Sequence, residues 1–264
     1  MTNNASQPDA RVITARRAIA LLDLTELGDA ATAAEVEALC ARASTSDGTV
    51  AAVCVWPRHV GTAKAALAGN GVRIATVVNF PTGREPTADV VEQTTAALAD
   101  GAEEVDVVLP YGSFAAGDVA AAADVLDAVR AVVPHGSGHL MKVILETGEL
   151  QDPDLIDAAA RFAIVHGADF IKTSTGKTQT SATLAATAVM LHAIRETDGR
   201  VGLKPSGGIR IFEDAAAYLA QADAVMGAGW VSPRTFRFGA SGLLTALIAV
   251  LHDTAPTDTT ESSY

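Results

Sequence analysis

The segment DPDLIDAAARFAIVHGADFIKTSTGK, residues 152–177, contains the signals of a helix, a turn and a strand in succession. Asp152 and Pro153 predict the N-cap and first turn of a helix, and Gly167 suits the left-handed residue that ends one. Residues 169–173 then form a short apolar run, which is typical of parallel strands covered on both faces. This stretch therefore predicts a helix, a tight turn and a parallel strand in succession.

The same alternation extends along the chain in both directions. Similar turn sequences, Gly101-Ala102-Glu103, Gly167-Ala168-Asp169 and Gln221-Ala222-Asp223, each precede a short apolar run. The predicted strands are 20–23, 49–55, 73–79, 104–109, 140–146, 169–173, 201–204 and 222–227. Eight strand–helix units in about 250 residues predict an α/β fold, a single-domain (β/α)8 TIM barrel. A doubly wound open sheet is the alternative, but no Gly-x-Gly-x-x-Gly follows the first predicted strand.

Length and composition fit one globular domain. The chain has 264 residues, 49% of them hydrophobic, and a net charge of −12. We expect a disordered N-terminus over 1–10, the barrel over 11–253 and a flexible tail over 254–264. No apolar run is long enough for a transmembrane helix and no signal peptide is recognisable, so we expect a cytoplasmic protein without a membrane partner. The acidic charge argues against nucleic acid as a partner.

Three of the five lysines interrupt apolar runs. Lys142, Lys172 and Lys204 lie in the fifth, sixth and seventh predicted strands. A buried ammonium group is costly unless it is paired or loses its proton, and the neutral amine is a nucleophile. Any one of these lysines could instead reach water from a strand end. Three of them on successive strands favour amine chemistry.

Two carboxylates lie in the same set of strands. Asp106 interrupts the run 104–109, and Asp23 ends the first predicted strand. Either aspartate could serve only as the partner in a structural ion pair. The alternative is proton transfer beside an amine whose pKa is lowered by a neighbouring ammonium group. Together these residues suggest a carbonyl substrate held as a Schiff base, with a carbon–carbon bond made or broken beside the carbonyl.

Glycines, hydroxyl residues and one further lysine follow the last three predicted strands. In a (β/α)8 barrel the active site lies at the carboxyl ends of the strands, and phosphate commonly binds the loops after strands 7 and 8. Such loops offer hydroxyl groups and backbone N–H groups to an anion. The residues predicted to bind substrate or phosphate are Thr175, Gly176, Lys177, Gly207, Gly208, Gly239, Ser241 and Gly242.

The histidines show no spacing typical of metal ligands. His135 and His139 are close in sequence, but they lie in a Gly-, Pro- and Ser-rich loop that favours a solvated position. Cys40 and Cys54 are too few for a zinc knuckle or a disulfide framework. We therefore expect no metal site, and a zinc-dependent aldolase is disfavoured.

These motifs resemble the deoxyribose-phosphate aldolase family of class I aldolases. The resemblance runs from about Leu21 to Tyr264 and is carried by segments 170–177, 101–111, 142–150, 201–210, 23–25, 53–58, 78–81 and 236–241. It implies reversible cleavage of 2-deoxy-D-ribose 5-phosphate to D-glyceraldehyde 3-phosphate and acetaldehyde, without a cofactor. It also implies small phosphorylated sugar and aldehyde substrates. The sequence does not reveal the oligomeric state, and a homodimer is one candidate because relatives are often dimers.

The resemblance implies a role for each residue of the predicted lysine network. Lys172 would be the Schiff-base nucleophile, and Lys204 would lower its pKa by like-charge proximity. Asp106 would transfer protons together with Lys204 and a bound water. Lys142 and Asp23 would line the same polar interior and orient the network.

Outside this network the resemblance bears on three residues. Cys54 would lie near the substrate and could be inactivated by reactive aldehydes, although a small buried hydrophobe is its simpler role. Tyr264 would reach the site on the tail and assist proton exchange at the enamine carbon. Gly242 stands where many relatives have a second serine, so a backbone N–H would replace one hydroxyl contact to phosphate.

Two other functions stay open from the sequence. One is another lysine-dependent barrel aldolase, acting on a phosphorylated ketose or keto acid, with a larger donor pocket beside Lys172. The other is a non-catalytic sugar-phosphate-binding barrel, in which ligand binding would survive Lys172→Ala. The joint presence of Lys172, Lys204 and Asp106 argues against a mere binding protein, because binding needs no reactive amine.

Overall fold

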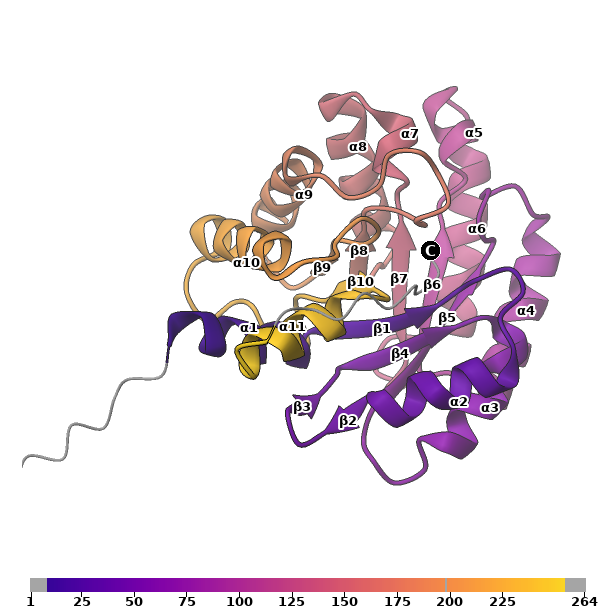
Figure 1. Cartoon of the computed structure of the whole chain (residues 1–264). Helices are drawn as coiled ribbons and strands as arrows, with labels where there is room; N and C mark the ends of the chain where they lie inside the picture. The colour runs from indigo at the N-terminus through magenta and orange to yellow at the C-terminus, as the bar shows by residue number, and fades with distance from the viewer. Residues whose placement is uncertain (1–8, 198, 255–264) are drawn as a thin grey trace, which may run out of the picture.

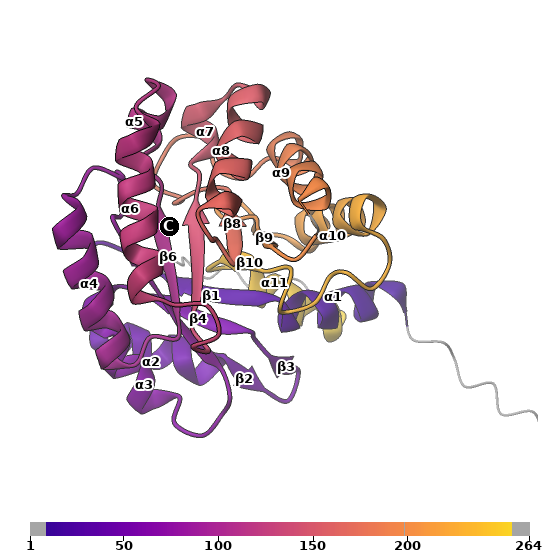
Figure 2. The same cartoon turned by 180° about the vertical axis from the view of Figure 1, so that it is seen from behind.

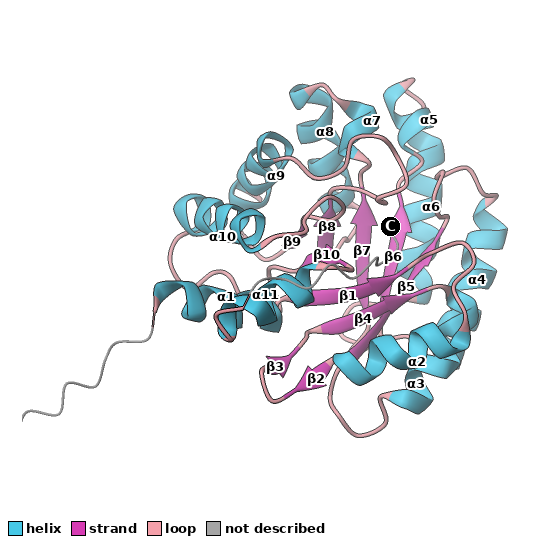
Figure 3. Cartoon of the chain, viewed as in Figure 1, coloured by secondary structure: helices cyan, strands magenta, loops and turns pink. Residues whose placement is uncertain are grey.

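The strands form a closed barrel. The computed structural model describes residues 9–197 and 199–254. Within them, eight parallel strands follow the order β10-β1-β4-β5-β6-β7-β8-β9 (Figures 1 and 3). The strands are β1 (Leu22–Glu26), β4 (Ala52–Val55), β5 (Arg73–Val78), β6 (Glu104–Val108), β7 (Leu140–Ile144), β8 (Phe170–Lys172), β9 (Gly202–Lys204) and β10 (Phe238–Ala240). The predicted (β/α)8 fold is confirmed.

Contacts between β9 and the segment around β10 close the ring. Leu203 bridges to Phe236 and Ser206 bridges to Gly239, both in parallel orientation. The Gly239 N–H also donates to the Pro205 carbonyl at 2.9 Å. Closure removes the free sheet edges and brings the carboxyl ends of the strands to one end of the barrel.

Helices cover the outside of the ring, as the view from behind also shows (Figure 2). They are α1 (Ala10–Ala20), α2 (Ala33–Arg42), α3 (Val60–Ala66), α4 (Thr87–Asp100), α5 (Tyr111–Ala115), α6 (Val119–Val132), α7 (Thr147–Leu150), α8 (Pro153–Val165), α9 (Leu184–Glu196), α10 (Phe212–Met226) and α11 (Leu243–Leu251). A short hairpin, β2 (Ser44–Thr45) with β3 (Gly48–Thr49), and a 3-10 turn, η1 (Pro57–His59), complete the described elements. In the described part of the chain, no helix combines the length and the apolar character needed to cross a membrane.

Side chains alternate along each strand between the helices outside and the barrel interior. In β6, Val105 and Val107 belong to the apolar core that the helices share. Glu104 and Asp106, on the opposite face, both contact Lys142 inside the barrel. The interior of such barrels is usually filled by layers of bulky apolar side chains. Here a layer of buried charges takes the place of part of that packing.

Gly202 on β9 leaves room for the ring of Phe170 on β8. The two residues are register partners in the sheet. A Cβ atom built on Gly202 would lie 2.3 Å from Cε1 of Phe170. Glycine at this position therefore allows an aromatic ring to fill the barrel interior on the amino-terminal side of Lys172.

The predicted eighth strand was wrong. Residues 222–227 are almost wholly the end of α10, and Gln221-Ala222-Asp223 is part of that helix rather than a turn. Buried Phe212, Ala215, Leu219 and Ala222 recur at helical spacing, and this periodicity outweighs the short apolar run at its end. The actual eighth strand is Phe238–Ala240. Gly239, which was predicted to lie in the loop after the eighth strand, therefore lies within that strand, and Ser241 and Gly242 follow it. The first strand also begins later than predicted, at Leu22.

The two ends of the chain bear on the predicted domain limits. Helix α1 begins at Ala10, and the Asp9 side chain accepts the Arg11 N–H at 2.9 Å as its N-cap. Residues 1–8 and 255–264, with Tyr264, lie outside the described residues. The disorder expected of both ends and the role expected of Tyr264 stay predictions.

Candidate functional site

One buried carboxylate joins three lysines inside the barrel. Asp106 Oδ1 lies 2.7 Å from Lys142 Nζ, and Asp106 Oδ2 lies 3.0 Å from Lys172 Nζ and 2.8 Å from Lys204 Nζ. All four residues are fully buried. They come from the consecutive strands β6, β7, β8 and β9, whose inner faces meet at the barrel axis. The structure thus brings together four of the residues predicted from the sequence.

The network extends through two more carboxylates to an arginine. Asp23 lies 2.6 Å from Lys204 and 2.6 Å from Arg237. Glu104 lies 2.7 Å from Lys142 and 3.0 Å from Arg237. Asp23 therefore joins the site as predicted, and a continuous chain of ionic contacts runs from the lysines toward the amino-terminal end of the barrel.

Glu104 and Arg237 belong to the buried network but were not predicted from the sequence as site residues. Glu104 lies two residues before Asp106 in the same strand. Side chains two residues apart in a strand point to the same face, so this spacing could have placed Glu104 on the inner face. Arg237 directly precedes Phe238, the first residue of the strand that was not predicted. Its inward position could not be recognised without that strand.

Cations outnumber carboxylates by one in this network. Its cations are Lys142, Lys172, Lys204 and Arg237, and its carboxylates are Asp23, Glu104 and Asp106. Arg73 also contacts Glu104 at 2.7 Å, but its side chain is partly exposed. Within the network Lys142 contacts all three carboxylates, whereas Lys172 contacts Asp106 alone. Lys172 is thus the cation of the network with the fewest ionic contacts to its carboxylates.

The cations keep the carboxylates ionised. Burial by itself raises the pKa of Asp106, but the charges of the three lysines outweigh burial and lower this pKa well below 3.8. Burial opposes the charged forms of Asp23 and Glu104 as well, and neighbouring cations lower the pKa of both. For Lys142, burial lowers the pKa, but Asp106 and Glu104 raise it above its usual 10.5.

The loop after β9 has the backbone conformation that glycine permits. Gly207 and Gly208 both have φ of 79°. The Gly207 N–H donates to the Gly239 carbonyl at 3.2 Å, so it is not free for an anion. The N–H of Gly208 has no acceptor among the described residues, and Gly208 is exposed. Of the two predicted donors, Gly208 is therefore the one available to a ligand.

The remaining predicted loop residues lie at the same end of the barrel. Ser241 donates its hydroxyl to the Thr25 carbonyl at 2.9 Å, and Gly242 is the N-cap of α11. Gly239 lies within β10, and Gly176 has φ of 81° in the loop after β8. Lys177 pairs with the exposed Asp29 at 2.9 Å. Lys177 thus lies away from the buried network and close to solvent.

Glu146, which the sequence analysis did not single out, anchors the loop after β8. Its carboxylate accepts the Thr175 N–H at 3.2 Å, the Thr175 hydroxyl and the Thr178 hydroxyl at 3.2 Å. Glu146 is buried and has φ of 55°, a left-handed conformation that is uncommon for residues other than glycine. Burial raises its pKa, against the opposing effect of hydrogen bonds from Thr175. Strain of this kind is concentrated at functional sites.

We expect Glu146→Ala to weaken substrate binding more than it slows turnover. The substitution leaves the Thr175 and Thr178 donors without their acceptor, which costs about 1–3 kcal/mol or roughly 5- to 150-fold in KM. Steady-state kinetics with the phosphorylated substrate measure the separation of KM from kcat. Glu146→Gln keeps one oxygen acceptor and should recover part of the affinity. A fall in kcat with unchanged KM would contradict a role in positioning the loop.

Cys54 lies in β4 within a small apolar cluster that also contains Leu27, Val77 and Ile144. Burial raises the pKa of its thiol, so the neutral form dominates. These surroundings fit the small buried hydrophobe weighed from the sequence. Among residues 9–197 and 199–254, no three His, Cys, Asp or Glu side chains gather into a set that could hold a metal ion.

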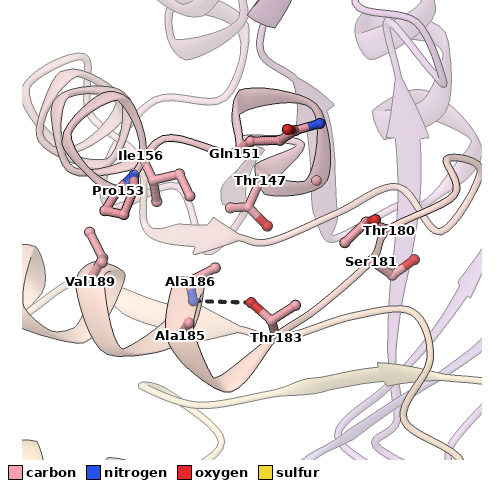
Figure 4. A pocket seen from close by; sticks show the side chains of 11 residues that line it. Thr147, Gln151, Pro153, Ile156, Thr180, Ser181, Thr183, Ala185, Ala186 and Val189 are labelled. Atoms are coloured by element: carbon pink, nitrogen blue, oxygen red, sulfur yellow. Dashed lines mark hydrogen bonds between the residues drawn. The ribbon is translucent and has the colours of Figure 1, made fainter.

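A cavity of about 340 Å³ lies on the outer side of the loop after β8 (Figure 4). Its lining includes the hydroxyl residues Thr147, Thr180, Ser181 and Thr183 and no charged side chain among the described residues. Thr183 accepts the Ala186 N–H at 3.1 Å and caps α9. The lack of a lining cation distinguishes this cavity from the lysine site.

The family model and a curated relative indicate the same family of aldolases. Residues 17–245 match the family model described as DeoC/LacD family aldolase. The chain is 51% identical over 234 residues to a curated deoxyribose-phosphate aldolase from Agrobacterium fabrum, a match that covers 88% of this chain and 90% of that protein.

Solved structures with this fold include a Toxoplasma gondii ME49 protein provisionally described as a deoxyribose-phosphate aldolase. It has a TM-score of 0.84 and 26% identity and covers 93% of this chain and 96% of that one. The tetrameric deoxyribose phosphate aldolase from Aeropyrum pernix has a TM-score of 0.70 and 24% identity, with coverage of 92% and 98%. At 24% identity, the similarity to the Aeropyrum pernix protein shows a shared fold and no more.

Proposed function

The chain belongs to the DeoC/LacD family of aldolases, and from this premise we propose that it is a class I deoxyribose-phosphate aldolase. It would reversibly cleave 2-deoxy-D-ribose 5-phosphate to D-glyceraldehyde 3-phosphate and acetaldehyde. The observation that carries the proposal is the Asp106 carboxylate, which three fully buried lysines share at the centre of the barrel.

Lys172 is the proposed nucleophile. Lys172 and Lys204 both lie within 3.0 Å of the same Asp106 oxygen, so like-charge repulsion favours the state in which one of them is neutral. Lys142, held by three carboxylates, stays an ammonium group.

The reaction begins when the Lys172 amine attacks the aldehyde carbon of the open-chain sugar. The resulting carbinolamine loses water and becomes an iminium ion, which withdraws electrons from the neighbouring carbon–carbon bond. Loss of the proton from the C3 hydroxyl breaks the C2–C3 bond and releases glyceraldehyde 3-phosphate. The enamine left on Lys172 takes a proton at carbon, and water then hydrolyses the imine to acetaldehyde.

Asp106 and Lys204 are placed to move protons in these steps. Asp106 accepts hydrogen bonds from Lys172 at 3.0 Å and from Lys204 at 2.8 Å, so it joins the reacting nitrogen to a second donor. A proton can pass along this path as the carbinolamine forms and loses water. Asp23 contacts Lys204 at 2.6 Å and fixes its position.

The substrate phosphate would bind at the loops after β8, β9 and β10. Gly208 offers a backbone N–H and Gly242 the amino-terminal end of α11. The Ser241 hydroxyl, which donates to the Thr25 carbonyl, would have to turn away from that carbonyl to donate to the phosphate. Thr175, Gly176 and Lys177 would face the hydroxyl groups and the phosphate from the loop after β8. Gly207 and Gly239, which bond to each other, would shape the loops that present these donors.

Borohydride trapping tests the proposed mechanism. The protein is incubated with acetaldehyde, reduced, digested and mapped by mass spectrometry, and its five lysines can all be distinguished. We expect a reduced adduct on Lys172 that requires both aldehyde and borohydride. The exposed Lys64 serves as an internal control for nonspecific modification.

A parallel assay of cleavage separates the proposal from its alternatives. Active protein without an adduct on Lys172 would overturn the Schiff-base mechanism. A larger keto donor that is used better than acetaldehyde would indicate a different lysine-dependent aldolase. Sugar phosphate binding without cleavage or adduct would indicate a binding protein. The homodimer and the cytoplasmic location stay predictions from the sequence.

A further inference from the structure

A cavity of about 890 Å³ lies at the amino-terminal end of the barrel, opposite the proposed phosphate loops. Its lining comes from segments that lead into or begin seven of the strands, including Val50 before β4, Leu140 on β7 and Val201 before β9. This volume is within the range of sites that enclose small ligands. No step of the proposed aldol reaction uses this basal cavity.

Positive charge is concentrated in the basal cavity. Four of the chain's fourteen arginines line it, although the whole chain has a net charge of −12. The four are Arg73, Arg200, Arg234 and Arg237. Asp169 is the one acidic residue among the described lining residues, and Arg130 pairs with it at 2.8 Å. The cavity therefore has an excess of cations.

Two of these arginines are held in place and a third is available. Arg237 is buried and bonded to Asp23 and Glu104, and Arg73 is held by Glu104 and by the Gly138 carbonyl at 2.7 Å. The guanidinium group of the exposed Arg234 has no partner among the described residues. An anion could therefore bind Arg234 without breaking an existing ion pair.

Part of the lining is apolar. The ring of Phe170 lies 5.6 Å from the Arg237 guanidinium carbon, and Leu140, Val50 and Val201 add aliphatic surface. Arginine binds phosphate oxygens through two parallel N–H groups, and it also stacks on aromatic rings. The cavity thus combines phosphate recognition with a surface for a nonpolar group.

We propose that the basal cavity is a second ligand site, which binds a small phosphate monoester carrying an apolar or aromatic group. The phosphate contacts Arg234 and the neighbouring arginines, and the nonpolar group lies along the half-buried Leu140 and Val201, above the buried ring of Phe170. The site shares Arg237 with the buried network but includes none of its lysines, so it stands whether or not the chain is an aldolase.

Phenyl phosphate is a suitable probe because it has no carbonyl and cannot form an imine. Calorimetric titration should show that Arg234→Glu weakens its binding by about tenfold or more, since the change replaces a phosphate donor with a repelling charge. Arg195→Glu makes the same change of charge on the outside of α9 and should leave binding unchanged. A crystal soaked with phenyl phosphate should show it in the basal cavity.

Inorganic phosphate tests the apolar part of the site. We expect it to bind more weakly than phenyl phosphate by about tenfold, because it buries no nonpolar surface. Equal binding of phenyl phosphate by the wild type and by Arg234→Glu would overturn the proposal. So would phenyl phosphate found only at the carboxyl ends of the strands. Equal affinity for inorganic phosphate and phenyl phosphate would show that the cavity does not bind the nonpolar group of the ligand.

Discussion

Replacing Lys172 with methionine is expected to abolish cleavage of 2-deoxyribose 5-phosphate and to leave the barrel about as stable as before. Without the amine no imine can form, so kcat/KM should fall by about 10⁴-fold or more. Methionine carries no charge at this position, so the three remaining cations face three carboxylates. Steady-state kinetics test the predicted loss of cleavage, and the midpoint of thermal unfolding, measured on the same preparation, tests the predicted stability.

Lys142→Met is the matched control for the charge argument. Lys142 contacts Asp23, Glu104 and Asp106, so its loss removes the one cation that all three buried carboxylates share. The free energy of unfolding should then fall by about 3–5 kcal/mol. Equal losses of stability in Lys142→Met and Lys172→Met would refute the idea that Lys142, with three carboxylate contacts, stabilises the network more than Lys172, with one. Retained cleavage in Lys172→Met would refute its role as nucleophile.

Asp106→Asn is expected to impair both stability and turnover. The substitution removes the one anion that Lys142, Lys172 and Lys204 share. Uncompensated buried charge should lower the free energy of unfolding by about 3–5 kcal/mol. Loss of the proton path should lower kcat by about 10²- to 10⁴-fold. Denaturant titration and single-turnover kinetics measure the two effects separately.

The difference in the free energy of unfolding between the wild type and Asp106→Asn should become smaller as pH falls. Burial opposes the charge on Asp106, but the lysines hold its folded pKa well below 3.8. A lowered pKa contributes stability above the unfolded value of about 3.9, and this contribution is lost as pH falls through the folded pKa. The difference between wild type and Asp106→Asn should therefore be constant near neutral pH and shrink in acid. A difference that grows as pH falls would contradict this linkage.

Asp157→Asn is the control for removing one carboxylate. Asp157 pairs with Arg161 on the surface of α8 at 2.7 Å, and both side chains are more than a third exposed. Exposed pairs of this kind contribute about 0.3–0.5 kcal/mol. A destabilisation as small as this in Asp106→Asn would show that the buried network does not depend on its central anion.

Most of the fold could be predicted because its signals are local. The N-cap at Asp152 and the left-handed Gly167 both occur where the sequence places them, and seven of the eight barrel strands overlap their predicted runs. The eighth was missed because Phe238–Ala240 contains a glycine and no β-branched residue, whereas the equally short β8 contains Ile171 and β9 directly follows Val201. Its pairing partners, β1 and the segment after β9, lie far away in sequence. No local pattern therefore distinguishes this strand from a loop.

The lysines and aspartates were recognised for a related reason. A charged residue inside an apolar run is conspicuous in any sequence, so the sequence alone was enough to select Lys142, Lys172, Lys204 and Asp106. Glu146 lacked such a signal. It follows the last residues of an apolar run at a loop, where a glutamate is ordinary, and only the folded chain shows that it anchors Thr175.

The sequence alone was enough to predict seven of the eight barrel strands and to select the strand lysines and Asp106 as candidates for chemistry. These features follow from the short-range periodicity of apolar residues and from the cost of burying charge. Only the tertiary structure decided which charges meet. Closure of the barrel brings Asp23 and Arg237, which are 214 positions apart, within 2.6 Å of each other. It also gathers four arginines around one basal cavity. Such contacts depend on the register of the closed ring, and register is a property of all eight strands together.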